Sequence, residues 1–200
     1  MISIKKKKFL AKGKRSNVYT AFLGNKKVGI KVARKDISVK EHIANEAKFL
    51  KILNKKKIGP KLLHSKKDSI IYKFIEGERI LDWMEKANKK NIKRILKDIF
   101  EKCYILDSLQ IEKKEMHHPI KHILIEKNNA KMIDFERCRK TEKPKNTTQF
   151  CQFLISKKVS DILTKKGFKK IKKSTLISLV KDYKKDFNKK NIKKIINLLK

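Results

Sequence analysis

The chain has 200 residues and a mass of 23.6 kDa, and its 56 Lys and Arg residues against 20 Asp and Glu give a formal net charge of +36. A hydrophobic fraction of 40% excludes a disordered basic tail, because this much apolar surface can form a core. No apolar run approaches the ~18 residues of a membrane span, and the first residues lack the apolar stretch of a signal peptide. We therefore expect a soluble, cytoplasmic protein with no membrane partner, built as one domain or two small lobes.

The positive charge comes almost wholly from Lys, which binds phosphate as a flexible point charge and not as a bidentate fork. The number of acidic residues is much lower than the number of basic ones, so a polyanionic partner such as RNA or a ribonucleoprotein stays a possible interpretation. The cysteines are odd in number and form no CxxC pair, so we expect buried free thiols and no structural zinc site or disulfide framework.

The first 77 residues show strand-like patterns from Phe9 onward, with one helix inserted. The helix is predicted over 40–53, because Ile43, Ala47, Leu50 and Leu53 recur at helical spacing, and Ser38 is a suitable cap. Short β-branched and aromatic runs predict strands at 18–23, 28–32, 61–64 and 69–74, the first two joined by the turn Gly24-Asn25.

After Glu76 the pattern becomes helical. Helices are predicted at 80–87, at 91–109 and from 148 onward with breaks near Gly167 and Asn188, and two short strands at 123–125 and 131–133. We therefore expect an α+β chain with a β-rich N-terminal lobe (1–77) and a reduced helical C-terminal lobe (78–200), together forming one domain.

Three features of the first lobe point to phosphate binding. The turn at 11–19 contains Gly13, where a missing Cβ lets backbone N–H groups approach phosphate oxygens, although an ordinary basic hairpin has the same pattern. Lys31 lies inside the apolar run 28–32, where a buried ammonium needs an anion unless it faces solvent on an edge strand. Glu46, on the predicted helix, could pair with Lys31 and direct it toward a phosphate.

Asp134 closes an apolar strand in the run Met132-Ile-Asp134-Phe-Glu136-Arg137. A carboxylate at a strand end is what a magnesium–phosphate site uses. A turn-initiating Asp has the same pattern, so these residues alone leave both interpretations open.

In this order, the features resemble the protein kinase signature sequence over roughly residues 9–137. They are the turn with Gly13 and Val18, the V-G-I-K run ending at Lys31, the helical Glu46, the hinge Tyr72-Lys-Phe-Ile-Glu76, the I-L-I strand and the D-F-E run at Asp134. The chain is most similar to the small archaeal predicted serine/threonine kinases, with the RIO and KEOPS-complex kinases as more distant relatives. The resemblance implies a two-lobed kinase-like fold that binds ATP and Mg²⁺ in a cleft between the lobes.

The resemblance also implies roles, position by position. Lys31 would contact the α- and β-phosphates, Glu46 would orient Lys31, and Asp134 would hold Mg²⁺. Gly13 and Val18 would belong to the ATP-binding turn, and backbone groups from Phe74 to Glu76 would contact adenine.

The expected catalytic loop departs most from the kinase pattern. Residues 115–122 stand where H-R-D-L-K-P-x-N is typical, and Glu136 replaces the Gly of D-F-G. Counting back from the I-L-I strand places His122 at the metal-binding Asn and His117 at the catalytic Asp. Counting forward from the preceding helix places Glu115 at the Asp instead, so the two counts disagree by two residues.

We favour Glu115 as the base, because a carboxylate can orient a substrate hydroxyl and accept its proton late in the reaction. His117 is the runner-up. His122 could ligate a divalent metal, and Lys121 could supply the positive charge that the usual loop Lys gives the γ-phosphate.

Two alternatives remain beside a serine/threonine kinase or ATPase. The loop could be structural, which would make the chain a pseudokinase that acts as a basic RNA- or ribosome-associated protein. The Lys-rich segments 165–173 and 189–200, expected as helices, could then contact RNA phosphates, or be simply solvated. The His cluster at 117–122 also permits a zinc site, which Pro119 opposes because it disfavours a helix there.

Overall fold

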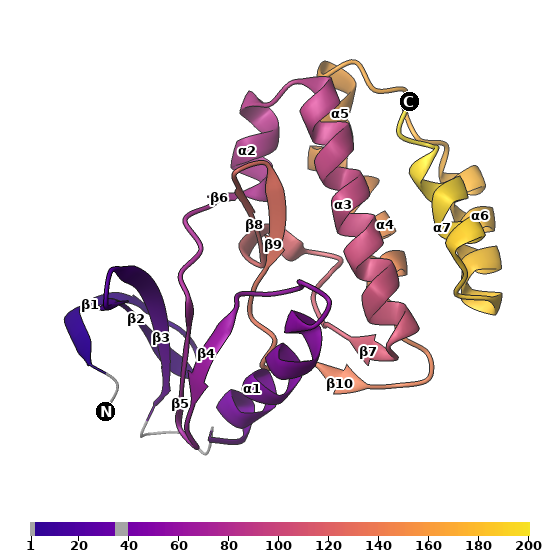
Figure 1. Cartoon of the computed structure of the whole chain (residues 1–200). Coiled ribbons are helices and arrows are strands. Elements are labelled where there is room, and N and C mark those ends of the chain that lie inside the picture. Colours follow the sequence, from indigo (N-terminus) through magenta and orange to yellow (C-terminus); the bar gives the residue numbers. More distant parts are fainter. Residues whose placement is uncertain (1–2, 35–39) are drawn as a thin grey trace. The chain divides into compact units, whose positions relative to one another are not determined.

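The structure is a computed structural model that describes residues 3–34 and 40–200. It divides into two compact units, residues 1–76 with 131–138 and residues 77–130 with 139–200 (Figure 1). The predicted cap Ser38 lies outside the described residues. Within the described ranges, no helix is both long enough and apolar enough to cross a membrane.

The first unit is built on an antiparallel five-stranded sheet with the order β1-β2-β3-β5-β4. Its strands are β1 (Ile4–Lys12), β2 (Ser16–Leu23), β3 (Lys26–Ala33), β4 (Leu62–Ser65) and β5 (Ser69–Lys73). The hairpin predicted at Gly24-Asn25 is confirmed. The turn expected over 11–19 is shorter, because Ser16 already pairs with Ala33 across the β2–β3 ladder, and β1 begins well before Phe9.

The two faces of this sheet differ in character. Directly paired residues share a face, so Val18 and Ile70, which both pair with Lys31, lie on the same face as its side chain. The opposite face carries a separate apolar cluster made of Ala21, Val28, Ile30 and Ile71 with the partly buried Tyr19, Leu23 and Val32. Lys31 therefore points away from that cluster.

Helix α1 (Lys40–Asn54) confirms the helix predicted from residue 40. Its predicted apolar face is buried, at Ile43, Ala47, Leu50 and Leu53. At the last residue of the helix, the Asn54 side chain donates to the carbonyls of Ile58 and Pro60 and accepts from the Leu62 amide. This fixes the connection from α1 to β4.

The second unit is mainly helical, with α2 (Ile80–Lys86), α3 (Lys89–Ser108), α4 (Asn146–Leu154), α5 (Lys157–Lys165), α6 (Lys173–Lys185) and α7 (Lys189–Ile196). The predicted breaks near Gly167 and Asn188 are confirmed. The expectation of a helix over 165–173 is wrong, because Gly167 takes a φ of 81° just after α5 ends and α6 begins only at Lys173. The last helix also ends earlier than expected, at Ile196.

The second unit also contains short strands. A three-stranded sheet has the order β6-β8-β9, with β6 (Glu78–Arg79), β8 (Ile123–Glu126) and β9 (Asn129–Met132). The last two residues of β9 already belong to the first unit. A second ladder pairs β7 (Ile111–Glu112) with β10 (Arg139–Lys140). A 3₁₀ turn, η1 (Pro119–Lys121), stands directly before β8.

Asp107 is a buried polar centre of the second unit. Its carboxylate, at the end of α3, accepts hydrogen bonds from the backbone amides of Asn146 and Thr147 at 3.1 Å each, and from the Tyr183 hydroxyl at 2.9 Å. It thereby satisfies N–H groups at the start of α4 and ties α3, α4 and α6 together. Burial raises the pKa of Asp107, and the hydrogen bonds from Thr147 and Asn146 oppose that rise.

Candidate functional site

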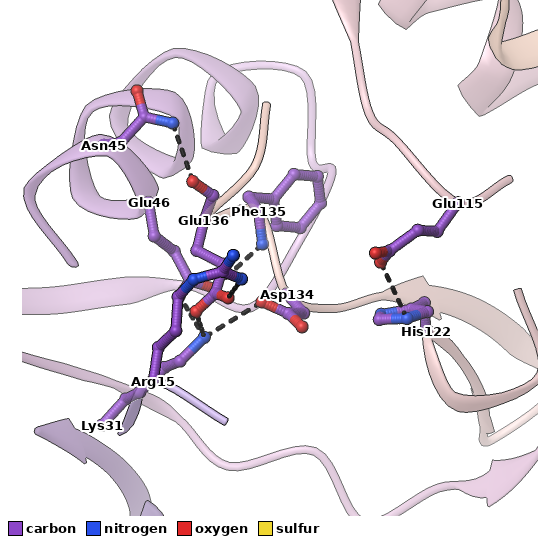
Figure 2. Close-up of polar contacts among 9 residues, drawn as sticks. All are labelled: Arg15, Lys31, Asn45, Glu46, Glu115, His122, Asp134, Phe135 and Glu136. Carbon is purple, nitrogen blue, oxygen red and sulfur yellow. Dashed lines mark hydrogen bonds and ion pairs between the residues drawn. The ribbon is translucent and has the colours of Figure 1, made fainter. Parts of the chain in front are cut away.

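The predicted phosphate-site residues of the first unit converge on the Lys31 ammonium (Figure 2). Its Nζ donates to Glu46 Oε2 at 2.7 Å and to Asp134 Oδ1 at 3.0 Å, and it lies 2.9 Å from Glu136 Oε2. Lys31, Glu46 and Glu136 are all buried. The structure therefore brings together Lys31, Glu46 and Asp134, while their roles toward ATP stay predictions.

The ion pairs decide the charge state of this centre. Burial alone would lower the pKa of Lys31, but the charges of Glu46, Asp134 and Glu136 outweigh burial and hold that pKa above its ordinary value. Burial raises the pKa of Glu46, Lys31 counteracts the rise, and the charge of Asp134 adds to it. Lys31 is therefore a fixed cation at any pH near neutrality.

The D-F-E segment is held by two neighbouring residues of α1. Glu46 accepts from the Phe135 amide through Oε1 at 3.0 Å, and the Asn45 side chain donates to the carbonyls of Glu136 and Cys138 at 2.9 Å each. The Phe135 side chain is fully buried. These contacts fix the backbone at Phe135, Glu136 and Cys138, which carries the Glu136 carboxylate and follows Asp134 directly.

Asp134 has a positive φ of 63°. Among non-glycine residues, Asp and Asn tolerate this left-handed conformation best, because a short polar side chain can bond locally. An unusual backbone conformation at a cluster of charged groups is a frequent property of functional sites.

Arg15, which sequence reasoning assigned no role, joins the centre from the turn between β1 and β2. Its guanidinium donates to Glu136 Oε1 at 3.1 Å. Gly13 begins this turn and donates its amide to the Ser16 carbonyl at 2.8 Å, and a Cβ at Gly13 would lie only 3.0 Å from that oxygen. The tight turn thus explains why a glycine stands at position 13. The same turn positions the Arg15 side chain.

The centre has the composition of a site for a divalent cation. Ligand oxygens of Glu46, Asp134 and Glu136 lie within 4.8 Å of one another, and carboxylate oxygens are the ligands that Mg²⁺ prefers. Lys31 forms ion pairs with all three of these carboxylates, and Arg15 forms a second ion pair with Glu136. Among the residues that the structure describes, no histidine joins a cluster of this kind.

Tyr72 covers the sheet next to Lys31. It pairs with Gly29 across the β3–β5 ladder, and a Cβ at Gly29 would lie 2.4 Å from Tyr72 Cε2. Gly29 is therefore required by the close approach of this ring. Burial, reinforced by the charge of Glu46, raises the pKa of Tyr72 to about 12.

The hinge segment follows β5. The Phe74 amide donates to the Lys27 carbonyl at 3.2 Å, and Lys27 Nζ lies 4.8 Å from the centre of the Phe74 ring and pairs with Glu76. The Phe74 N–H is therefore committed to the sheet, which limits the expected adenine contact to other backbone groups of this segment.

In the second unit, the structure joins two residues of the expected catalytic loop. Glu115 Oε2 lies 3.1 Å from His122 Nε2, and both side chains are partly buried (Figure 2). Glu115 has a φ of 77°, and its carbonyl accepts from the His118 amide, which closes a tight turn. His117 and Lys121 are exposed.

Sequence reasoning missed Arg15 and Asn45. Arg15 carried a usable signal, because an Arg is unusual in a chain whose positive charge is almost wholly Lys, and Arg forms directed ion pairs with carboxylates. Asn45 carried none, since an Asn within a helix has no position-specific pattern.

Of the comparisons with known proteins, the one with solved structures bears on the fold. No model of a known protein family matches the sequence. The chain is 32% identical over 75 residues to a protein of Methanocaldococcus jannaschii named uncharacterized protein MJ1211, a match that spans 38% of this chain and 64% of that protein. Among solved structures, it is similar to the autoinhibited serine kinase domain of the giant muscle protein titin, with a TM-score of 0.56 and 18% identity over 69% of this chain and 46% of that one. The chain thus spans less than two thirds of the length of either protein, and its fold is protein-kinase-like, with a β-sheet N-terminal region and a helical C-terminal part.

Proposed function

We propose that the chain binds ATP with Mg²⁺ and transfers or hydrolyses the γ-phosphoryl group, as a member of the small archaeal serine/threonine kinase type. The observation that carries the proposal is the contact of Lys31 with both Glu46 and Asp134 in a kinase-like fold. Phosphoryl transfer depends on positioning and on charge stabilisation, and this is the arrangement of groups that such chemistry uses.

The residues of the first unit have distinct parts in this proposal. Lys31 binds α- and β-phosphate oxygens, and Glu46 holds Lys31 in place from α1. Asp134 holds the metal, which supplies charge neutralisation at the phosphates when bound. Val18, in register with Lys31 on β2, lies on the same face of the sheet and offers an apolar contact for the nucleotide.

Glu115 is the proposed base. Its contact with His122 fixes the carboxylate orientation, and a carboxylate so held can accept the proton of a hydroxyl acceptor on a protein side chain or of water. The same contact occupies His122 Nε2, so the proposal assigns His122 to orienting Glu115 in preference to metal binding. His117 stays the alternative base, and Lys121 an additional cation for the γ-phosphate.

The test is transfer or release of labelled γ-phosphate from ATP with Mg²⁺. The wild type is compared with Asp134→Asn, which tolerates the same φ, with Glu115→Gln, and with the exposed control Asp161→Asn on α5. We expect Glu115→Gln to lose about 10²–10⁴-fold in rate, as for the removal of a general base. Asp134→Asn should fall to background, and the control should match the wild type. Equal rates in all four proteins would refute an enzymatic function.

A second candidate function, binding of single-stranded RNA by a fold with vestigial chemistry, is favoured by β1. Its consecutive residues Lys5–Lys8 are exposed, Phe9 is 61% exposed and packs edge-on against Tyr19, and Lys7 Nζ lies 4.1 Å from the centre of the Tyr19 ring. Lysines beside exposed aromatic rings are a known platform for single strands. Affinity for an RNA oligonucleotide should fall steeply with salt, and Phe9→Ala should weaken it; a salt-independent affinity would refute this candidate.

A further inference from the structure

The Glu136 carboxylate lies where two cations of the first unit meet. Its Oε1 accepts from Arg15 at 3.1 Å and its Oε2 lies 2.9 Å from Lys31 Nζ, and the residue is 8% exposed (Figure 2). A carboxylate that bridges an ammonium and a guanidinium has the surroundings that a nucleotide phosphate would require.

Lys31 has no donor to spare in this state. An ammonium carries three N–H donors, and the carboxylates of Glu46, Asp134 and Glu136 all lie within 3.0 Å of its nitrogen. A phosphate can therefore bind Lys31 only if one of these carboxylates leaves.

The three carboxylates are not equally replaceable. Glu46 is 3% exposed, and its second oxygen accepts from the Phe135 amide, so its departure from Lys31 would also disturb a buried hydrogen bond to the main chain. Asp134 is the proposed metal ligand. The Glu136 carboxylate contacts the two cations, while Asn45 holds the Glu136 backbone carbonyl independently of its side chain. Its side chain can therefore turn away while the main chain stays fixed.

We propose that Glu136 is an internal competitor for the phosphate position, and that Arg15 together with Lys31 forms the anion site that a nucleotide phosphate takes from it. This inference rests on the proposed function, since it concerns the same Lys31. It assigns Arg15 to phosphate binding, and it assigns Glu136 the opposite effect, of lowering affinity for any polyphosphate.

Two substitutions test the proposal, because they should change the affinity for polyphosphates in opposite directions. Glu136→Gln keeps the shape but removes the competing charge, so we expect polyphosphates to bind about tenfold more tightly, as for the loss of one competing charge-assisted contact. Arg15→Ala removes a ligand of the phosphate, so we expect binding about tenfold weaker. If the Arg15–Glu136 pair merely tethers the turn, both substitutions disorder the same contact and both weaken binding.

The measurement is isothermal titration calorimetry of the full chain with ATP and, separately, with inorganic tripolyphosphate, each in EDTA and in excess Mg²⁺. Two controls change the same charges elsewhere: Glu41→Gln on the exposed side of α1, and Arg94→Ala on the exposed side of α3. Both controls should stay within about twofold of the wild type, the range expected for exposed charges away from a site. Circular dichroism melts verify folding, and Glu136→Asp, with a shorter reach, replaces Glu136→Gln if the latter does not fold.

Each outcome decides one proposal. Opposite shifts for Glu136→Gln and Arg15→Ala support the internal competitor. Shifts in the same direction, or none beyond the controls, overturn it even if ATP binds. Failure of ATP to bind wild type and variants overturns the proposed function, and the tripolyphosphate titrations then decide the anion site by themselves.

Discussion

Substitution of Lys31 by Met should be strongly destabilising at neutral pH. Lys31 is 7% exposed and is the shared partner of Glu46, Asp134 and Glu136, so its loss leaves buried negative charges beside one another. Removing one partner of a buried ion pair costs about 3–5 kcal/mol, and protonation of a carboxylate limits the cost. We expect a loss of about 3 kcal/mol, the lower end of that range, because Arg15 still neutralises Glu136.

The loss should depend on pH with a definite sign. Burial raises the pKa of Glu46, and the substitution removes the charge of Lys31, the largest of the effects that counteract the rise. A carboxyl with a raised pKa in the folded state favours folding most below its unfolded pKa, and that contribution is lost as pH rises through the folded pKa. The deficit of Lys31→Met relative to wild type should therefore shrink as pH falls from neutral toward about 4, near the pKa of an unperturbed Glu.

Urea unfolding followed by far-ultraviolet circular dichroism measures this, with the exposed Lys26→Met on the same strand as control. Lys26→Met should change the free energy of unfolding by less than about 0.5 kcal/mol, as for an ordinary surface substitution. The double variant Lys31→Met/Glu46→Gln should be more stable than Lys31→Met at pH 7, because it removes a buried unpaired charge. Equal stability of Lys31→Met and Lys26→Met, or no recovery in the double variant, would refute the reasoning.

Two further predictions concern packing and cysteine chemistry. Gly29→Ala should lower the free energy of unfolding by about 1–3 kcal/mol through overpacking, because the new Cβ would lie 2.4 Å from Tyr72 Cε2. Adding Tyr72→Leu should recover part of this loss in the same urea assay. A Gly29→Ala variant as stable as the wild type would show that the Tyr72 ring is not confined. Burial raises the pKa of the Cys103 and Cys151 thiols, so an aqueous thiol reagent should label neither in the native protein and both in 6 M urea. Mass spectrometry measures the labelling, and rapid labelling of the native protein would contradict the burial of these thiols.

Local periodicity was enough to predict the elements that carry the site. The apolar positions of α1 that recur at helical spacing, Ile43, Ala47, Leu50 and Leu53, are all buried in the structure. The Lys31–Glu46 contact was also predictable, since a cation in an apolar strand and an acid on the flank of a helical stripe each need a partner. The protein-kinase-like fold follows from the same residues in order, and the titin kinase structure supports it.

The parts of the fold and of the site that the sequence did not predict depend on contacts between residues far apart in the chain. Arg15 and Glu136 are 121 residues apart in the chain, and no local pattern pairs them. The ladder of β7 and β10 has two residues in each strand, too few for any alternation to be recognised. In the expected catalytic loop, sequence counting gave two registers, and only three-dimensional structure could show that Glu115 and His122 pair with each other.

Asn45 and Glu46 give the first unit a mechanical property. Two consecutive side chains of α1 hold the main chain at Phe135, Glu136 and Cys138, so the helix and this segment behave as one rigid part. A helix that swung outward would break all three hydrogen bonds at once. Switching of this protein by rotation of α1 is thus costly, and a change of state at the site is more economically made by side-chain rotamers than by movement of the helix.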